Sequence, residues 1–238
     1  MSAVPTTAGQ TAVRAAVWSA LATVQDPELA EPLTDLGFVS RCEVSDGVAV
    51  VRLRLPTYFC APNFAYLMVA DAYDAVSAVP GVTHTDIRLE DHFAADAING
   101  GVAARSGFVA SFAGEAVDEL DDLRADFLRK AVLAGTDRVC RQIGADATRL
   151  AQLTLADAPD TVETRRLRDR RRELGLPAAD TDALIIDPAD GRAVPANKLR
   201  RHLGVARVTR VSQDANSGVC RGMLAARYPG LVRQEDAG

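Results

Sequence analysis

The sequence predicts an α+β protein: a small α-β-β-α-β domain with a three-stranded mixed sheet, followed by a mainly helical C-terminal extension. Three observations carry this prediction. Two segments of the first half have apolar residues at helical spacing, and an Asp-Gly pair between them separates two segments that suit strands. The second half consists mostly of charged, helix-forming stretches. We place the first domain at residues 11–95 and the extension at residues 96–238.

The first helix and the hairpin follow from local patterns. Apolar residues at helical spacing predict a helix over residues 12–24, which ends at Asp26-Pro27 because a residue before proline disfavours the helical region. Residues 38–44 and the alternating residues 48–55 predict two antiparallel strands. Asp46-Gly47 between them is typical of a tight hairpin turn.

The rest of the first domain is a helix and a strand. Residues 64–79 are amphipathic and end at Pro80-Gly81, and residues 82–91 alternate as in a half-buried strand. Helices are therefore expected on one face of the sheet. The glycine-rich residues 98–107 are weakly patterned, and we expect them to form the connection out of this domain.

Helices are expected to dominate the extension. Residues 114–144 predict one or two helices, with acidic side chains early and basic ones late, as the helix dipole favours. Residues 161–176 predict a highly charged helix. Residues 183–195 are typical of a short strand and a turn. Residues 198–230 are expected to form helices that are interrupted near Ser212 to Gly218.

Composition excludes several classes of protein. The formal net charge is −5, with 48% hydrophobic and 25% charged residues, as in ordinary globular proteins. We find no stretch long and apolar enough for a membrane span and no signal peptide, so we expect a cytoplasmic protein with reduced cysteines. The cysteines form no CxxC or CxxH pair, and motifs for nucleotide binding and hydrolysis are missing. We expect no enzymatic activity.

Six arginines crowd the charged helix, at positions 165, 166, 168, 170, 171 and 172. Such a run can bind phosphates or nucleic acid. Acidic residues are interleaved with it, aromatic stacking partners are lacking and the pI is near 5.3. We therefore expect a solvent-exposed face that docks on protein rather than on nucleic acid.

A quieter constellation surrounds Cys60. This cysteine lies in the loop TYFCAPN between the second strand and the second helix. There the dipole and free N–H groups of the helix favour the thiolate, which is a nucleophile and a soft metal ligand. The carboxylates of Asp26 and Glu28 are expected near the same sheet edge, where they can complete a metal's coordination or accept protons. The alternative is a buried structural cysteine beside an Asp-Pro helix stop.

These motifs resemble the metal–sulfur cluster assembly factor family, which includes the SufT and PaaD proteins. That family has a helix ending in DPE, a DLG turn, a D-G hairpin bend, a cysteine-containing loop and a helix ending in P-G-V. The corresponding residues stand in this order at 26–28, 35–37, 46–47, 60 and 80–82. The resemblance covers about residues 11–92. Two features depart from the family: Ala61 stands where proline usually follows the cysteine, and a long extension follows the domain.

The resemblance implies a maturation factor that assembles or delivers iron or iron–sulfur clusters to a client metalloenzyme, with Cys60 as the functional thiol. Long forms resemble accessory proteins of bacterial di-iron monooxygenases, which implies an oxygenase subunit as the client. We expect a homodimer and no contact with nucleic acid or membrane. The alternative is an interaction or scaffold protein without metal chemistry that helps fold or assemble an oxygenase subunit.

A third constellation lies in the extension: His202, Asn216 and Cys220, with Cys140 upstream. If the C-terminal segment folds back onto the first domain, Cys220 joins Cys60 at one soft metal site. The alternative is that Cys220 packs in a core with Val219, Met223 and Leu224. Cys42 and Cys140 are expected to be structural. His84 and His92 are expected at the surface near the ends of a strand.

Overall fold

The computed structural model describes residues 7–114, 116 and 120–230. The chain divides into two compact units. Unit 1 comprises residues 1–120 and 217–238, and unit 2 comprises residues 121–216. These units do not coincide with the expected domains 11–95 and 96–238, because unit 1 also contains the helical segment after residue 95 and the end of the last helix.

A three-stranded mixed sheet forms the centre of unit 1. β1 (Val39–Ser45) pairs antiparallel with β2 (Val48–Arg54), which pairs parallel with β3 (His84–Glu90). The hairpin turn is at Asp46 and Gly47, with φ of 50° and 79°. Two successive positive φ angles match the twist of the flanking strands, so the Asp-Gly pair closes the hairpin as predicted.

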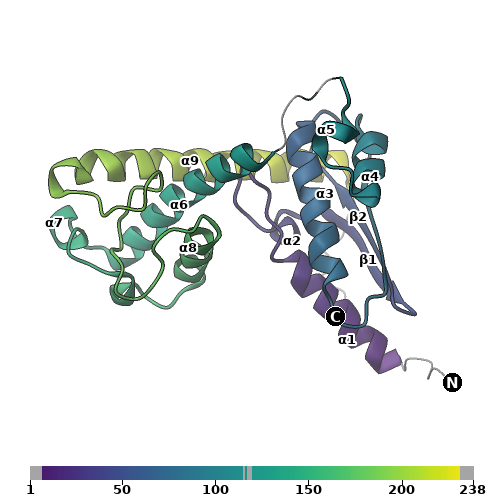
Figure 1. Cartoon of the computed structure of the whole chain (residues 1–238), viewed down its shortest axis with the longest axis horizontal. Helices are drawn as coiled ribbons and strands as arrows, with labels where there is room; N and C mark the ends of the chain where they lie inside the picture. Colours follow the sequence, from purple (N-terminus) through teal and green to yellow (C-terminus); the bar gives the residue numbers. More distant parts are fainter. Residues whose placement is uncertain (1–6, 115, 117–119, 231–238) are drawn as a thin grey trace. The chain divides into compact units, whose positions relative to one another are not determined.

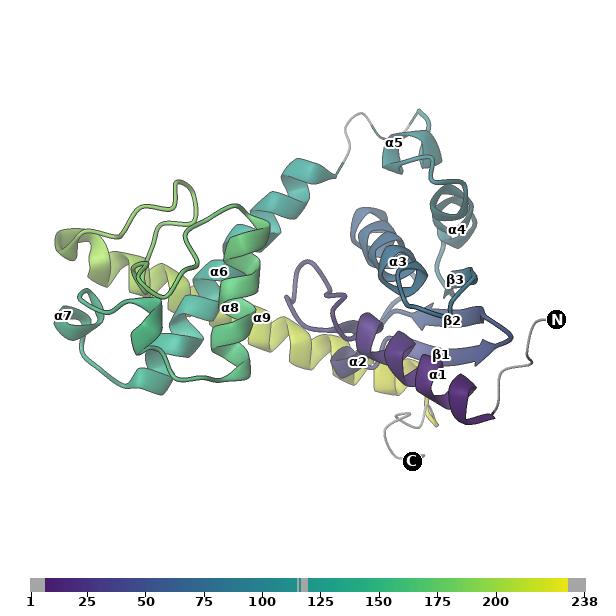
Figure 2. The same ribbon diagram turned by 60° about the horizontal axis from the view of Figure 1, so that its bottom comes forward.

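Helices cover one face of this sheet (Figures 1 and 2). α1 (Thr7–Leu21) packs on β1 and α3 (Pro62–Ser77) packs on β3, with α1 and α3 in contact. A short α2 (Leu33–Leu36) precedes β1. The alternate residues of β2 that face these helices are buried. Ion pairs between the strands, Arg52–Asp86 and Arg54–Glu90, are formed by half-buried side chains of the alternate positions. The predicted fold class is confirmed.

The glycine-rich segment after β3 is a helix, so the expectation of an irregular connection at residues 98–107 was wrong. α4 (Ala95–Ala104) packs against α3 and β3, and α5 (Phe108–Ser111) follows. Ile98 and Val102, four residues apart, are buried. The Asn99 side chain forms two hydrogen bonds with the backbone of Leu89 in β3. Packing and these bonds outweigh the poor helix propensity of two adjacent glycines.

Unit 2 is built from helices and a long loop. Its helices are α6 (Asp121–Ile143), α7 (Ala147–Leu150), the 3₁₀ helix η1 (Leu155–Asp157), α8 (Val162–Glu173) and the larger part of α9 (Ala196–Arg227). Its core is formed by small aliphatic side chains such as Val132, Leu155, Leu167 and Leu184. Residues 183–195 were expected to hold a short strand. They contribute only isolated bridges, Thr154 to Ala183 and Ile186 to Ala193.

The last helix, α9, runs without interruption from Ala196 to Arg227. The expected break near Ser212 to Gly218 was wrong, because its polar residues are used inside the helix. Gln213 and Ser217 are buried. Asp214 binds Arg210 one turn earlier, and Arg221 donates to the Ser217 hydroxyl. These contacts at i,i+4 spacing support the helix where propensity is weak.

The arginine-rich helix α8 is only partly solvated, which corrects the expectation of an exposed face. Arg170 is 3% exposed and Arg171 is completely buried, whereas Arg165 and Arg172 are exposed. Arg171 donates to the carbonyl oxygens of Ala183 and Leu184 and so holds the long loop against α8. A charge pattern does not reveal this role, because backbone carbonyls rather than carboxylates accept these bonds.

Within the described residues, no helix combines the length and the apolar character that a membrane crossing requires.

Candidate functional site

Cys60 lies in the loop between β2 and α3, as predicted. α3 begins at Pro62 with Ala61 as its N-cap, so Cys60 directly precedes the helix cap. Proline suits this first helical position, because its ring fixes a helical φ and the missing N–H would have no helical partner. The Cys60 thiol is partly exposed and lies 3.2 Å from the Thr57 hydroxyl oxygen. An accessible thiol is thus held at the entry to a sixteen-residue helix.

The loop after β3 supports the Cys60 loop. His92 is buried, which corrects the expectation of a surface residue, whereas His84 is exposed. The Nδ1 atom of His92 accepts a hydrogen bond from the Ala94 amide, so the proton is on Nε2. This Nε2 donates to the carbonyl oxygen of Cys60, 2.7 Å away. Burial lowers the pKa of His92, which favours this neutral form. Sequence reasoning missed this role because it depends on two loops that meet at the ends of parallel strands.

Asp26 is a buried carboxylate in the turn after α1. Its Oδ1 accepts hydrogen bonds from the amides of Glu28 and Leu29, at 2.9 and 2.8 Å. Burial raises its pKa from 3.8 to about 6, although these two bonds act in the opposite direction. Glu28 is exposed. The DPE segment therefore has one carboxylate that is costly to ionise and one that is exposed.

The end of α9 packs within unit 1 and brings Cys220 toward these groups. Arg221 pairs with Glu31, and Arg227 donates to the carbonyl oxygens of Leu55 and Asp91. The pKa of the Cys220 thiol is raised to about 11, chiefly by burial and also by the nearby acidic groups Asp26, Cys60 and Glu28. Charge effects of this kind act over short distances. Cys220 therefore lies in the same part of unit 1 as Cys60 and the DPE segment.

The other cysteines are in apolar surroundings. Cys42 and Cys140 are buried, and burial raises their pKa values to about 11 and 12. Both fit the structural role expected for them. Around Cys220, Leu224 is buried but Val219 and Met223 are exposed, so the expected apolar core at this position is incomplete.

The wider C-terminal constellation is divided between the units. Cys220 belongs to unit 1, whereas His202, Asn216 and Cys140 belong to unit 2. In unit 2 His202 lines a cavity of about 720 Å³ together with Asp187, Arg192 and Lys198. Across the described part of the chain, no group of three or more His, Cys, Asp or Glu side chains is placed so that it could hold a metal ion.

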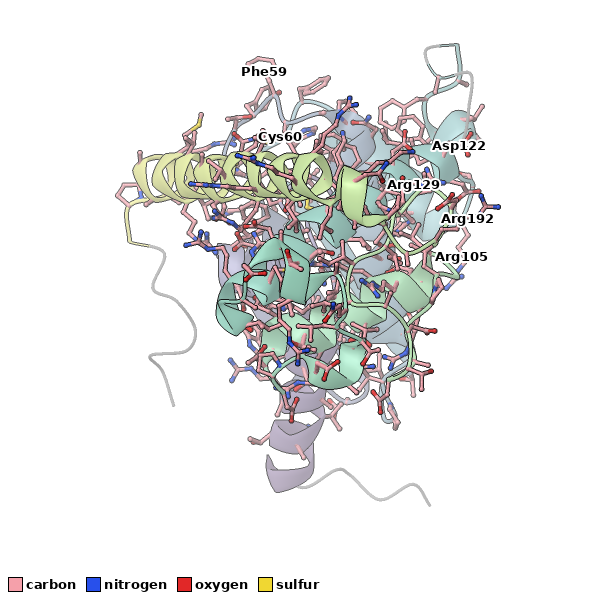
Figure 3. All side chains as sticks on the ribbon, turned by 90° about the vertical axis from the view of Figure 1, so that its left-hand side faces the viewer. Phe59, Cys60, Arg105, Asp122, Arg129 and Arg192 are labelled. Carbon is pink, nitrogen blue, oxygen red and sulfur yellow. The ribbon has the colours of Figure 1, made fainter. Side chains whose placement is uncertain are left out.

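Exposed aromatic rings next to Cys60 were not anticipated from the sequence. Tyr58 and Phe59 precede the cysteine, and Phe93 follows His92. The three rings contact one another, with centroid distances of 5.0 to 6.4 Å. Figure 3 shows Phe59 projecting outward from the loop that carries Cys60. The pairing of Tyr58 and Phe59 was visible in the sequence, but the contribution of Phe93 depends on the fold.

Comparisons with known proteins match part of the chain. Residues 14–88 match a family described as "Iron-sulfur cluster assembly protein". An "Iron-sulfur cluster carrier protein" of Deinococcus radiodurans is 40% identical over 75 residues, which are 32% of this chain and 20% of that protein. The chain thus spans about a fifth of the length of that curated relative. No solved structure matches the chain significantly. The matched segment contains Asp26, Glu28 and Cys60.

Proposed function

We propose that the protein is a non-catalytic maturation factor that carries iron or an iron–sulfur cluster as transient cargo to a client metalloenzyme. One observation carries the proposal: the partly exposed Cys60 thiol lies within the segment that matches iron–sulfur cluster assembly proteins. Thiolates are the usual protein ligands of iron–sulfur clusters. Cys60 and Cys220 are the proposed thiolate ligands. Asp26 and Glu28, which are not placed with them as a set that could hold a metal ion, act through their negative charge.

The acidic groups at this site have two uses in the proposal. Burial, together with the negative charge beside it, keeps the Cys220 thiol protonated in the free protein, since its pKa is raised to about 11. The same carboxylates attract a ferrous ion or a cationic cargo. Loading therefore releases the Cys220 proton, and transfer to a stronger set of ligands in the client returns it.

A homodimer completes the ligand set in this proposal. Iron–sulfur clusters are usually bound by four cysteines, whereas Cys60 and Cys220 supply two thiols from one chain. Two copies that share one cluster supply four. We also propose that unit 2 docks on the client, for which a subunit of a di-iron monooxygenase is our specific candidate, and that transfer takes place in the reducing cytoplasm. No step of this proposal involves nucleic acid or a membrane.

The proposal is tested by anaerobic reconstitution of the full-length protein with ferrous iron and sulfide. We expect bound iron and sulfide, visible absorption of a cluster and a shift of the loaded protein to a dimer in size-exclusion chromatography. Cys60→Ser replaces a soft thiolate by a protonated hydroxyl of similar size and should remove bound iron with little change in melting temperature. Cys42→Ser, at a buried cysteine of the same unit, is the matched control and should retain iron.

Reactivity of the thiols gives an independent measurement. Cys60 should react with iodoacetamide faster than Cys42 or Cys140, because those two are buried and have raised pKa values. Mass spectrometry of tryptic peptides measures all three rates in one sample. A stable Cys60→Ser protein that still supports full activity of the client would instead favour the scaffold function, in which the domain binds the client without metal chemistry.

A further inference from the structure

The aromatic cluster beside Cys60, formed by Tyr58, Phe59 and Phe93, is unusually exposed. The exposed fractions of these residues are 47%, 75% and 49%. The chain has only twelve Phe, Trp and Tyr residues in all, so a quarter of them are in this cluster. Single exposed apolar residues are common on protein surfaces, but contiguous exposed apolar patches mark interaction sites.

The cluster is held in place by the two loops that carry it. The Phe93 amide donates to the Tyr58 carbonyl oxygen at 3.1 Å, and the buried His92 donates to the carbonyl oxygen of Cys60. The His92 ring also packs against the Phe93 ring, with a centroid distance of 4.9 Å. These contacts tie the rings to the ends of β2 and β3. A surface ordered in this way loses little conformational entropy when a partner binds.

Charged groups of both signs lie near the cluster. Arg54 pairs with Glu90, and Arg227 donates to two backbone carbonyl oxygens. Glu28 and Asp91 are exposed, and the Asp91 carboxylate accepts a hydrogen bond from the Tyr228 hydroxyl. Residues 1–109, which contain both aromatic loops, carry 6 basic and 12 acidic side chains and hence a net charge of −6. An apolar centre with an acidic surround complements a surface that has an apolar centre and a basic rim.

We propose that Tyr58, Phe59 and Phe93 form the docking surface for the protein that receives the cargo, and that this acceptor presents an apolar patch rimmed by lysine and arginine. The inference rests on the proposed carrier function and adds the chemistry of the partner. Docking on the aromatic cluster places the acceptor directly beside Cys60, and the partner's apolar surface excludes water from the thiol. Aromatic residues that become buried at the centre of an interface commonly dominate its binding energy.

The acidic surround favours a protein over the other surfaces that bind exposed aromatic rings. Anionic lipid headgroups would be repelled by Glu28 and Asp91. In the loaded dimer the shared cargo holds two copies together. Without the cargo a second copy would bring the same carboxylates together, which disfavours self-association and allows the acceptor to replace the copy on this face. Both alternatives are outcomes of the test.

The test uses photo-cross-linking in cells of the source organism. The full-length protein carries p-benzoylphenylalanine at position 93 or, as the matched control, at the exposed Ser45 beside the hairpin turn of unit 1. We expect an adduct from position 93, and not from position 45, with an iron-containing protein. Adding Phe59→Ser to the position-93 protein should lower the yield of this adduct at least tenfold. The acceptor identified in this adduct should have lost iron when it is isolated from cells in which our protein carries only Tyr58→Ser/Phe59→Ser.

Each other outcome overturns the proposal. Position 93 could give no adduct, an adduct equal to that of the control position, or an adduct only with a second copy of the chain. The adduct could also be unaffected by Phe59→Ser, or its partner could keep its iron in the variant cells. Sedimentation of the purified protein with phosphatidylglycerol vesicles, lost in Tyr58→Ser/Phe59→Ser, would also overturn it in favour of a membrane.

Iron binding separates this failure from failure of the carrier function. The purified Tyr58→Ser/Phe59→Ser protein should bind as much iron after reconstitution as the unaltered protein, with the same melting temperature, because both side chains are exposed. Normal iron binding without the position-93 adduct refutes the docking surface alone. Failure of the unaltered protein to bind iron refutes the carrier function itself.

Discussion

Each unit buries a charged side chain, and the two burials differ in kind. In unit 2 the guanidinium of Arg171 is completely buried and donates to backbone carbonyl oxygens of the loop that it holds. In unit 1 the carboxylate of Asp26 accepts two backbone hydrogen bonds, yet its pKa is raised to about 6, so ionisation at neutral pH costs stability. Arg171 supports its unit, whereas Asp26 destabilises its own at neutral pH.

Exposed apolar side chains also differ between the units. Those of unit 1 include a cluster of aromatic rings next to a thiol, whereas those of unit 2 include valines such as Val162, Val205 and Val208. Features that cost stability gather around Cys60 and Asp26, as is common at functional sites. The buried arginine of unit 2 is structural, whereas unit 1 contains the residues on which the proposed function depends.

The intrinsic probes of the chain separate the two units. Trp18 and all four tyrosines lie in unit 1. Tryptophan fluorescence thus reports on unit 1 alone, and far-UV circular dichroism reports on the helices of both units. Each prediction below uses this difference.

The largest effect is expected from Arg171→Glu. This change places a carboxylate against carbonyl oxygens in a buried position and should lower the stability of unit 2 by at least about 4 kcal/mol. Guanidinium denaturation should show an early loss of ellipticity, while the Trp18 transition stays in place. Arg172→Glu, at an exposed neighbour, should change stability by no more than about 1 kcal/mol. Equal effects of the two variants would contradict the structural role of Arg171.

A smaller effect, of opposite sign, is expected from Asp26→Asn. The folded pKa of Asp26 is about 6, above the ordinary 3.8, so folding favours the protonated carboxyl. Its contribution to stability is complete below about pH 4 and is lost as the pH rises through 6. Asparagine is neutral and still accepts from the Glu28 and Leu29 amides. At pH 7.5 the metal-free variant should therefore be more stable, by up to about 3 kcal/mol.

Denaturation followed by Trp18 fluorescence between pH 4 and 8 measures this difference. The gain should shrink as the pH falls toward 4, where the carboxyl is protonated in both states. Asp35→Asn, at an exposed carboxylate of the same unit, should show no such pH dependence. A variant less stable than the unaltered protein at pH 7.5 would show that the buried carboxylate stabilises unit 1.

The smallest effects distinguish two adjacent glycines of α4. A Cβ at Gly101 would lie 1.8 Å from the Ser111 hydroxyl oxygen in α5, so Gly101→Ala should cost about 1–3 kcal/mol. A Cβ at Gly100 would meet nothing within 4 Å, so Gly100→Ala should add about 0.5–1 kcal/mol through its better helix propensity. Trp18 fluorescence measures both. Gains from both variants would show that α4 and α5 do not pack closely.

Sequence reasoning succeeded where the signal is local. The hairpin follows from Asp46-Gly47 and the alternation of β2, and the position of Cys60 follows from a strand signal and a helix signal on either side of it. It failed where a distant partner decides. Residues 98–107 read as a linker because their glycines lower helix propensity, but Asn99 and the buried Ile98 anchor them to β3 and the core. Likewise, the segment that contains Gln213 and Ser217 was interpreted as an interruption of the helix, because the sequence does not show that these polar residues are buried on a continuous helix.

The sequence by itself determined the α+β class, the hairpin, and a cysteine in a loop between a strand and a helix. These features depend on periodicity and turn chemistry within a few neighbouring residues. Only the tertiary structure decided that Cys220 is influenced by the charges of Asp26 and Cys60, that His92 supports the Cys60 loop, and that Phe93 completes the aromatic cluster. Each of these depends on which segments meet after folding. Burial and hydrogen-bond partners far along the chain are set by the packing of the whole unit and not by local pattern.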